Sequence, residues 1–252
     1  VDVRPPCEYW GFFGARSEWG GVRFPARKGE VWWVEVQSER LGYTTDPLAV
    51  VQRRTGSDAA KPGWADVAEF TDQDASFGGP GYNTQTRDPA GRFEAPEDGE
   101  YRVVVRDLFR LSPAQPRLPY RLVVRRESPG FALVAHPVMP APADPNQRPA
   151  HPWTLFLRRG ETLPVRVLAF RRDGFGGGIE LEAEGLPVGI TAPVARIPAG
   201  QNVGILLLSA AADAPAWAGG FRVRGRGRAG EAEIAASAAA ASAVRSVGDY
   251  NT

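Results

Sequence analysis

Four aspartates in predicted loops could together ligate a hard cation. Asp72, Asp74 and Asp88 flank the glycine-rich residues 77–81, and Asp46 lies in another loop. Calcium takes about six to eight oxygen ligands, which loop carboxylates and backbone carbonyls can supply. The Gly and the bidentate Glu of an EF-hand are missing from their required positions. Aspartates also start turns by hydrogen-bonding to the nearby backbone, so a calcium site and simple turn formation both remain open.

A second group of residues could form a flat binding surface. In the predicted strand 31–36, the alternation of side chains places Trp32 on the core face and Trp33 with Glu35 on the opposite face. A tryptophan beside a carboxylate suits a sugar ring or a protein partner. Alternatively, a loop or a second domain covers Trp33. Three further tryptophans, all predicted to lie in loops, could extend this surface: Trp10, Trp19 and Trp64.

Hydrolytic chemistry has few candidate residues. The histidines are His136 and His151, both in a proline-rich stretch, and Cys7 is the single cysteine. A nucleophilic hydrolase needs a base beside a Ser or Cys nucleophile, and the chain contains no Gly-x-Ser-x-Gly elbow. A glycosidase that uses a pair of carboxylates remains open. The residue types therefore favour a protein that is not an enzyme.

Composition excludes several classes of protein. The chain has 252 residues, a formal net charge of +1 and 43% hydrophobic residues. A nucleic-acid binder that works by counterion release needs a strong basic excess, which is missing here. No apolar run approaches the roughly 18 residues of a membrane-spanning helix. With 29 glycines and 23 prolines, the chain is expected to fold as short elements joined by many turns.

Short strands separated by turn signals predict an all-β fold. Asp98-Gly99 marks a tight turn that is expected to join residues 92–95 and 101–107 as a hairpin. The predicted strands of the first half are residues 21–26, 31–36, 48–52, 92–95, 101–107 and 120–125. Those of the second half are residues 153–157, 163–170, 179–184, 189–194, 203–209 and 221–225. Their spacing predicts two tandem β-sandwiches.

Proline density sets the predicted domain limits. Residues 129–152 contain six prolines from Pro137 to Pro152 and are predicted to be a linker or long loop, because proline removes ladder donors. The first domain is then residues 1–128 and the second is residues 153–230. The alanine-rich residues 231–252 show no amphipathic helical face and form either a last strand or a tail.

The first half resembles bacterial pre-peptidase C-terminal (PPC) domains. The resemblance rests on residues 24–36 (FPARKGEVWWVEV), 92–96 (RFEAP) and 100–108 (EYRVVVRDL), with a closing strand at 120–124. It covers about residues 1–135 and implies a jelly-roll-like β-sandwich that is exported and not itself catalytic. Some relatives bind calcium or matrix polymers. These domains usually carry an Asp-rich turn before the first core strand, where this chain has Ser17-Glu18-Trp19.

The second half is similar to the Ig-like sandwich that often follows this domain in large secreted proteins of planctomycete-type bacteria. The similarity rests on residues 165–175, 179–181, 185–187 and 214–219. It implies an accessory or adhesion-type module within a longer secreted, periplasmic or cell-surface protein, with that protein's other domains as partners. The alternative is a carbohydrate- or matrix-binding module, possibly calcium-dependent, that uses Trp33, Glu35, Trp64 and the loop around Asp72.

Overall fold

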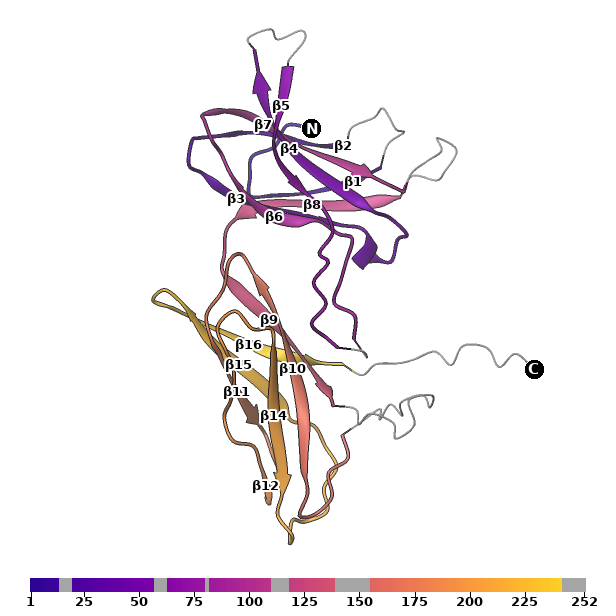
Figure 1. Cartoon of the computed structure of the whole chain (residues 1–252), viewed down its shortest axis with the longest axis vertical. Helices are drawn as coiled ribbons and strands as arrows, with labels where there is room; N and C mark the ends of the chain where they lie inside the picture. Colours follow the sequence, from indigo (N-terminus) through magenta and orange to yellow (C-terminus); the bar gives the residue numbers. More distant parts are fainter. Residues whose placement is uncertain (14–19, 57–62, 80–81, 110–117, 139–154, 242–252) are drawn as a thin grey trace, which may run out of the picture. The chain divides into compact units, whose positions relative to one another are not determined.

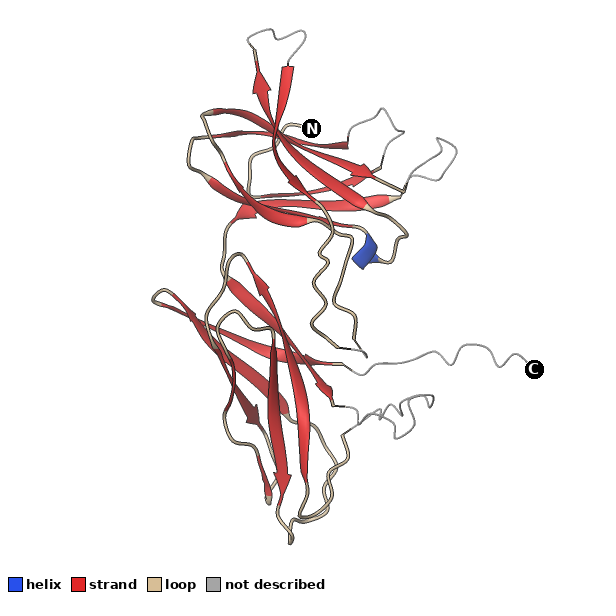
Figure 2. Ribbon diagram, viewed as in Figure 1, coloured by secondary structure: helices blue, strands red, loops and turns tan. Residues whose placement is uncertain are grey.

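The computed structural model describes residues 1–13, 20–56, 63–79, 82–109, 118–138 and 155–241. It divides the chain into two compact units. Unit 1 comprises Val1–Ser76 and Thr84–Ser128, and unit 2 comprises Phe77–Asn83 and Pro129–Thr252. The described residues are almost entirely strand and loop, as Figure 2 shows, so the predicted all-β class is confirmed. None of the described residues belongs to a helix long and apolar enough to cross a membrane.

Unit 1 is a sandwich of two four-stranded sheets (Figure 1). The first sheet has the order β1-β8-β3-β6, and the second has the order β2-β7-β4-β5. The strands are β1 (Cys7–Phe12), β2 (Gly20–Ala26), β3 (Val31–Gln37), β4 (Pro47–Thr55), β5 (Gly63–Phe70), β6 (Ala90–Glu94), β7 (Gly99–Asp107) and β8 (Pro119–Arg126). A 3-10 turn, η1 (Glu39–Leu41), follows β3.

The core of unit 1 is rich in aromatic side chains. Alternation in β3 buries Trp32, Val34 and Val36 on the inner face, as the sequence predicts. From the other sheet, Phe24 and Tyr101 pack against them, with the Phe24 and Trp32 ring centroids 6.1 Å apart. Burying such large rings supplies much of the hydrophobic stabilisation of a sandwich of this size.

Two strands of unit 1 occur where loops are predicted. Trp10 lies in β1 and Trp64 lies in β5, so their prediction as loop residues is wrong. The expected hairpin at Asp98-Gly99 is also wrong, because β6 pairs with β3 whereas β7 pairs with β2 and β4. The turn carries the chain from one sheet to the other, where the rings of Phe93 and Tyr101 pack together with centroids 5.2 Å apart.

Unit 2 is built from strands that assemble in the order β12-β14-β10-β9-β16-β15-β11-β13. The strands are β9 (Gly130–Pro137), β10 (Thr162–Arg172), β11 (Ile179–Glu184), β12 (Ile190–Thr191), β13 (Ala195–Ile197), β14 (Val203–Ala210), β15 (Arg222–Ala229) and β16 (Ala232–Ala240). β16 pairs with β15 through Ala232–Ser237 and with β9 through Ala238–Ala240. It therefore joins two groups of strands that enclose one apolar core.

The structure corrects three sequence predictions in this unit. Gly130–Pro137 forms β9 instead of a linker, because the prolines begin only at its last residue and the alternating apolar residues before them pair with β10. The alanine-rich segment forms β16, which is one of its two predicted states, and residues 242–252 lie outside the described part. Of the predicted strand 153–157, Leu155–Leu157 do not form a strand, and residues 153–154 lie outside the described part. Of the predicted strand 189–194, only Ile190–Thr191 form a strand.

The segment Phe77–Asn83 belongs to unit 2 although residues 1–128 are predicted as one continuous domain. The ring of Phe77 lies 5.1 Å from that of Phe170. Tyr82 stacks on His136 with ring centroids 5.9 Å apart. These aromatic contacts, together with the hydrogen bond from Arg166 Nη1 to the Gly78 carbonyl at 3.3 Å, explain why the segment is part of this unit.

Candidate functional site

The outer face of the β1-β8-β3-β6 sheet combines exposed aromatic rings with charged groups. Inward residues of β1 and β8 such as Tyr9 and Leu122 pack against the core, so the alternate residues face outward. We call this outer face the tryptophan face. Its members are Glu8, Trp10 and Phe12 from β1, Arg121, Val123 and Arg125 from β8, and Trp33, Glu35 and Gln37 from β3.

Strand register sets the rows of this face. Trp10 lies opposite Arg121, which lies opposite Gln37 on its other side. Another row of this face places Arg125 opposite Trp33. These partners come from segments far apart in the chain, so only the pairing of the strands brings them together.

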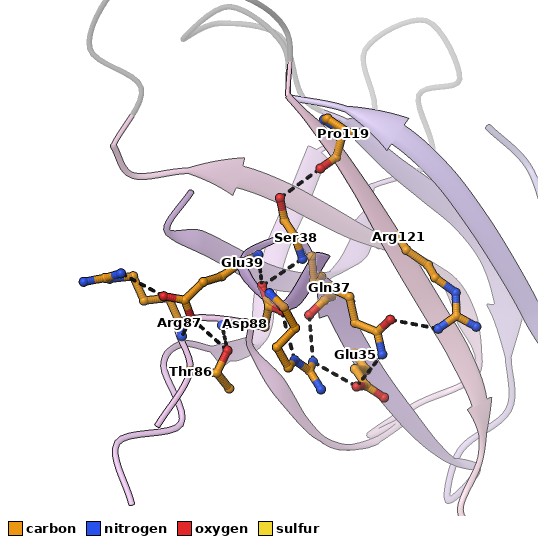
Figure 3. Close-up of polar contacts among 11 residues, drawn as sticks. Glu35, Gln37, Ser38, Glu39, Thr86, Arg87, Asp88, Pro119 and Arg121 are labelled. Carbon is orange, nitrogen blue, oxygen red and sulfur yellow. Dashed lines mark hydrogen bonds and ion pairs between the residues drawn. The ribbon is translucent and has the colours of Figure 1, made fainter. Parts of the chain in front are cut away.

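A chain of hydrogen bonds crosses the tryptophan face, part of which is drawn in Figure 3. Arg121 donates through Nη2 to Glu8 Oε2 at 2.5 Å and through Nη1 to Gln37 Oε1 at 2.9 Å. Gln37 Nε2 donates to Glu35 Oε1 at 2.9 Å. The hydrogen bond from Arg121 holds the pKa of Glu8 below its usual value, so Glu8 stays ionised at neutral pH.

The aromatic members present large apolar areas beside these polar groups. Trp10 is 57% exposed and Phe12 is 60% exposed. Trp10 Nε1 donates to Glu8 Oε1 at 3.0 Å, which fixes the indole edge. Trp33 is half-buried, and the guanidinium carbon of Arg125 lies 5.9 Å from its ring centroid. Such a face can stack planar or ring-shaped ligands while offering hydrogen-bond donors and acceptors at their edges.

One buried carboxylate organises the end of β3. Asp88 Oδ1 accepts the backbone N–H groups of Ser38 and Glu39, each at 2.8 Å. Asp88 Oδ2 accepts the Arg40 backbone N–H at 3.0 Å and its Nε at 2.9 Å. We call these four residues the Asp88 cluster. It closes the turn η1 and satisfies backbone donors that would otherwise be unpaired.

The Asp88 cluster is connected to the tryptophan face. Arg40 Nη2 donates to Glu35 Oε1 at 2.9 Å, so the arginine links the buried carboxylate to an outward-facing one. Within the cluster, the Glu39 carboxylate accepts hydrogen bonds from Thr86 and Arg87, as Figure 3 shows. Burial opposes ionisation of Glu39, but the hydrogen bonds and charge of Arg87 and Thr86 outweigh it and lower its pKa. Hydrogen bonds from Asp88 and from Arg87 therefore hold the turn η1.

Of the other three predicted calcium ligands, Asp46 and Asp72 lie close enough for their side chains to interact. Burial, followed by the charge of Asp72, raises the pKa of Asp46, whose backbone N–H donates to Asp107 Oδ1 at 2.9 Å. Asp74 is exposed, and its backbone carbonyl accepts from Gln85 Nε2 at 2.7 Å. Within the residues that the structure describes, no three His, Cys, Asp or Glu side chains are grouped to hold a metal.

Calcium is expected to leave the thermal stability of the protein unchanged. Both oxygens of Asp88 already accept protein donors, so a cation would have to displace four hydrogen bonds to use this carboxylate. A ligand present at 100 times its Kd would stabilise the fold by about 2.7 kcal/mol, an effect that calorimetry detects readily. The Tm measured in millimolar calcium should equal that in EDTA. A Tm several degrees higher in calcium than in EDTA would contradict this prediction and support a calcium site.

The predicted grouping of Trp33, Glu35 and Trp64 is divided between the two sheets of unit 1. Trp33 and Glu35 belong to the tryptophan face, whereas Trp64 lies in β5 of the second sheet, where the guanidinium carbon of Arg102 is 4.2 Å from its ring centroid. The second tryptophan beside Trp33 on the tryptophan face is Trp10 and not Trp64. Trp19 lies outside the described residues. The alternation of Glu8, Trp10 and Phe12 was the sequence signal for this strand.

The residues considered for hydrolysis have ordinary structural surroundings. Burial raises the pKa of the Cys7 thiol, which disfavours the thiolate needed for nucleophilic attack. Burial lowers the pKa of His136, whose ring stacks on Tyr82. His151 lies outside the described residues.

Comparison with known proteins gives one remote structural similarity. The chain matches no protein-family model and no curated protein. It is similar to the crystal structure of the pre-peptidase C-terminal domain of a collagenase from Bacillus anthracis, with 14% sequence identity and a TM-score of 0.32. The alignment covers 49% of this chain and 92% of that domain. A similarity of this size does not establish a family for the chain.

Proposed function

We propose that this chain is a non-catalytic accessory module of a larger secreted or cell-surface protein, and that unit 1 attaches that protein to a polysaccharide. The observation that carries the proposal is the tryptophan face, on which Trp10 and Phe12 are exposed beside a network of charged and amide groups. In this proposal unit 1 is a PPC-like sandwich and unit 2 is an Ig-like spacer.

The chemistry of the tryptophan face favours a sugar polymer of low charge. A pyranose ring offers C–H groups that stack on an indole and hydroxyls that exchange hydrogen bonds at its rim. Glu8 and Glu35 are balanced by Arg121 and Arg40, with which they form ion pairs. Because the charges of the network are paired, it offers directed hydrogen bonds with little net attraction for a polyanion.

The same network argues against catalysis by this face. A glycosidase needs a protonated carboxylic acid whose pKa is raised by its surroundings. Glu8 has a lowered pKa because of Arg121, and Glu35 accepts hydrogen bonds from Arg40 and Gln37. Glu8 is therefore suited to binding and not to proton donation.

Replacing Trp10 or Trp33 with alanine is expected to weaken polysaccharide binding. Removing an aromatic residue at the centre of a binding surface typically costs about 2 kcal/mol or more, which is about thirtyfold in Kd. Affinity electrophoresis and pull-down on cellulose, chitin, xylan and β-glucan would find the ligand and then compare the variants. Trp64→Ala is the matched control, because Trp64 lies on the other sheet of the same unit.

Two results would contradict this proposal. One is the absence of binding to any neutral polysaccharide in the panel. The other is equal loss of binding in Trp64→Ala and in the two variants of the tryptophan face, since that would indicate a general effect on folding. Unchanged Tm values for all three variants would show that the comparison concerns the surface alone.

A further inference from the structure

The outer face of β15 carries a regular ladder of arginines. Val223 is buried on the inner side, and alternation directs the four arginines outward. They are Arg222, Arg224, Arg226 and Arg228. Residues two apart on one face of a strand are about 6.6–6.8 Å apart along it. The ladder is therefore a row of cations with a fixed repeat.

On one side of this ladder lies β11, whose acidic side chains form ion pairs with the arginines. β11 directs Glu180, Glu182 and Glu184 outward, while Ile179 and Leu181 are buried. Glu182 lies 3.1 Å from Arg226 and Glu184 lies 3.5 Å from Arg224. A strand with acidic residues at alternate positions thus matches the arginine repeat.

The strand on the other side of the ladder is β16, whose outer side chains after Glu233 are small. Ala235 lies opposite Arg226 and Ser237 lies opposite Arg224, and both are exposed. A groove of about 340 Å³ lies here, lined by Arg222, Arg224, Glu184 and the β16 residues 235–237. Arg222 lies opposite Glu184 in the register but forms no ion pair with a described residue, because Glu184 pairs with Arg224. Guanidinium groups therefore line a space above β16 that the small residues leave open.

The backbone of β16 supplies the other half of the site. Among the residues that the structure describes, Ala232–Ser237 pair with β15 alone, and β9 joins β16 only from Ala238 onward. Half of the backbone N–H and C=O groups of this segment are therefore free to pair with another strand. Edge strands are normally protected by proline, lysine or a bulge. β16 has neither proline nor lysine, its pairing with β15 is regular, and Glu233 is the one charged residue within Ala232–Ser237.

We propose that the edge of β16 binds an extended peptide with acidic residues at alternate positions, as an added strand. The peptide backbone would pair with Ala232–Ser237, and its carboxylates would meet the guanidinium groups of Arg222 and Arg224 in the groove beside residues 235–237. β-Strand addition gives affinity through main-chain hydrogen bonds and specificity through alternate side chains. A guanidinium binds a carboxylate through two parallel hydrogen bonds, which favours an acidic partner over a neutral one.

The probe for this site is a fluorescein-labelled, acetylated peptide with the sequence of Ile179–Glu184, whose acidic alternation already matches the ladder. Fluorescence anisotropy with the full chain should show saturable binding. The double variant Arg222→Gln/Arg224→Gln should bind at least about tenfold more weakly, and Arg158→Gln, a variant of an exposed arginine elsewhere in unit 2, should bind normally. Ala235→Trp, which fills the groove, should abolish binding without lowering the Tm.

Hydrogen exchange locates the bound peptide. Binding should slow exchange in residues 232–237 and leave the tryptophan face unchanged. The proposal is overturned if the peptide does not bind, if a peptide with Gln at each Glu position binds equally well, or if Arg158→Gln weakens binding as much as the double variant. It is also overturned if a sulfated polysaccharide binds at the ladder while the peptide gives no protection at 232–237. Trp10→Ala should bind the peptide normally, so failure here and failure of the proposed polysaccharide function are distinguishable.

Discussion

Replacing Asp88 with alanine is expected to lower the free energy of unfolding of unit 1 by about 3–5 kcal/mol. Asp88 is fully buried, and its two oxygens accept three backbone N–H groups and the Nε of Arg40. The variant would leave these donors without an acceptor in a place that water reaches poorly, and each unpaired donor costs about 1–3 kcal/mol. Urea unfolding combined with hydrogen exchange would measure the loss in unit 1.

Matched variants separate the role of the Asp88 carboxylate from the loss of a charge. Asp88→Asn keeps one carbonyl acceptor and should lose less stability than Asp88→Ala. Asp74→Ala removes an exposed carboxylate from the same connection between β5 and β6 and should change stability by less than about 0.5 kcal/mol. Similar small losses in Asp88→Ala and Asp74→Ala would show that the Asp88 cluster does not hold the turn η1.

Loss of the Asp88 cluster should also weaken polysaccharide binding at the tryptophan face. Arg40 connects Asp88 to Glu35, so the orientation of Glu35 depends on a residue that does not itself face outward. At protein concentrations and temperatures at which Asp88→Asn remains folded, we expect weaker polysaccharide binding than in the unaltered protein. Asp74→Ala should bind normally, because no hydrogen bond of its side chain reaches this face among the described residues.

Replacing Gly21 with valine is expected to prevent unit 1 from folding or to destabilise it by more than about 3 kcal/mol. Gly21 has a φ of 146°, which side chains rarely allow. A Cβ at this position would lie 1.9 Å from the backbone oxygen of Val103 in the paired strand β7. That oxygen belongs to the sheet ladder, so it cannot move without breaking the pairing of β2 and β7.

Gly29→Val provides the control for the Gly21 variant. Gly29 also has a positive φ, of 80°, but no atom lies within 4 Å of the position that a Cβ would occupy. Its substitution should therefore cost only the backbone term, about 1–2 kcal/mol. Solubility, circular dichroism and thermal unfolding of the two variants would make the comparison. Equal losses in both would mean that the contact with Val103 has no effect beyond backbone strain.

Local sequence patterns were sufficient for some of the fold. Alternation in residues 31–36 correctly separates the buried Trp32 from Trp33. Such patterns fail where the strand signal is short or shares its residues with turn formers. β1, which follows two prolines, and β5, which follows Lys61-Pro62, are both examples. The hairpin expected at Asp98-Gly99 fails for a different reason, because a tight turn can equally lead into the opposite sheet.

The amino-acid sequence alone determined that the chain is all-β, and it determined which face of a predicted strand each side chain occupies, because alternation is a property of the local backbone. Only the tertiary structure decided which strands are neighbours. Trp10 meets Arg121, and Asp88 meets the end of β3, across long stretches of chain. Strand neighbours are chosen by the packing of the whole core and not by any local signal, so the tryptophan face and the Asp88 cluster exist only once the sheets have assembled.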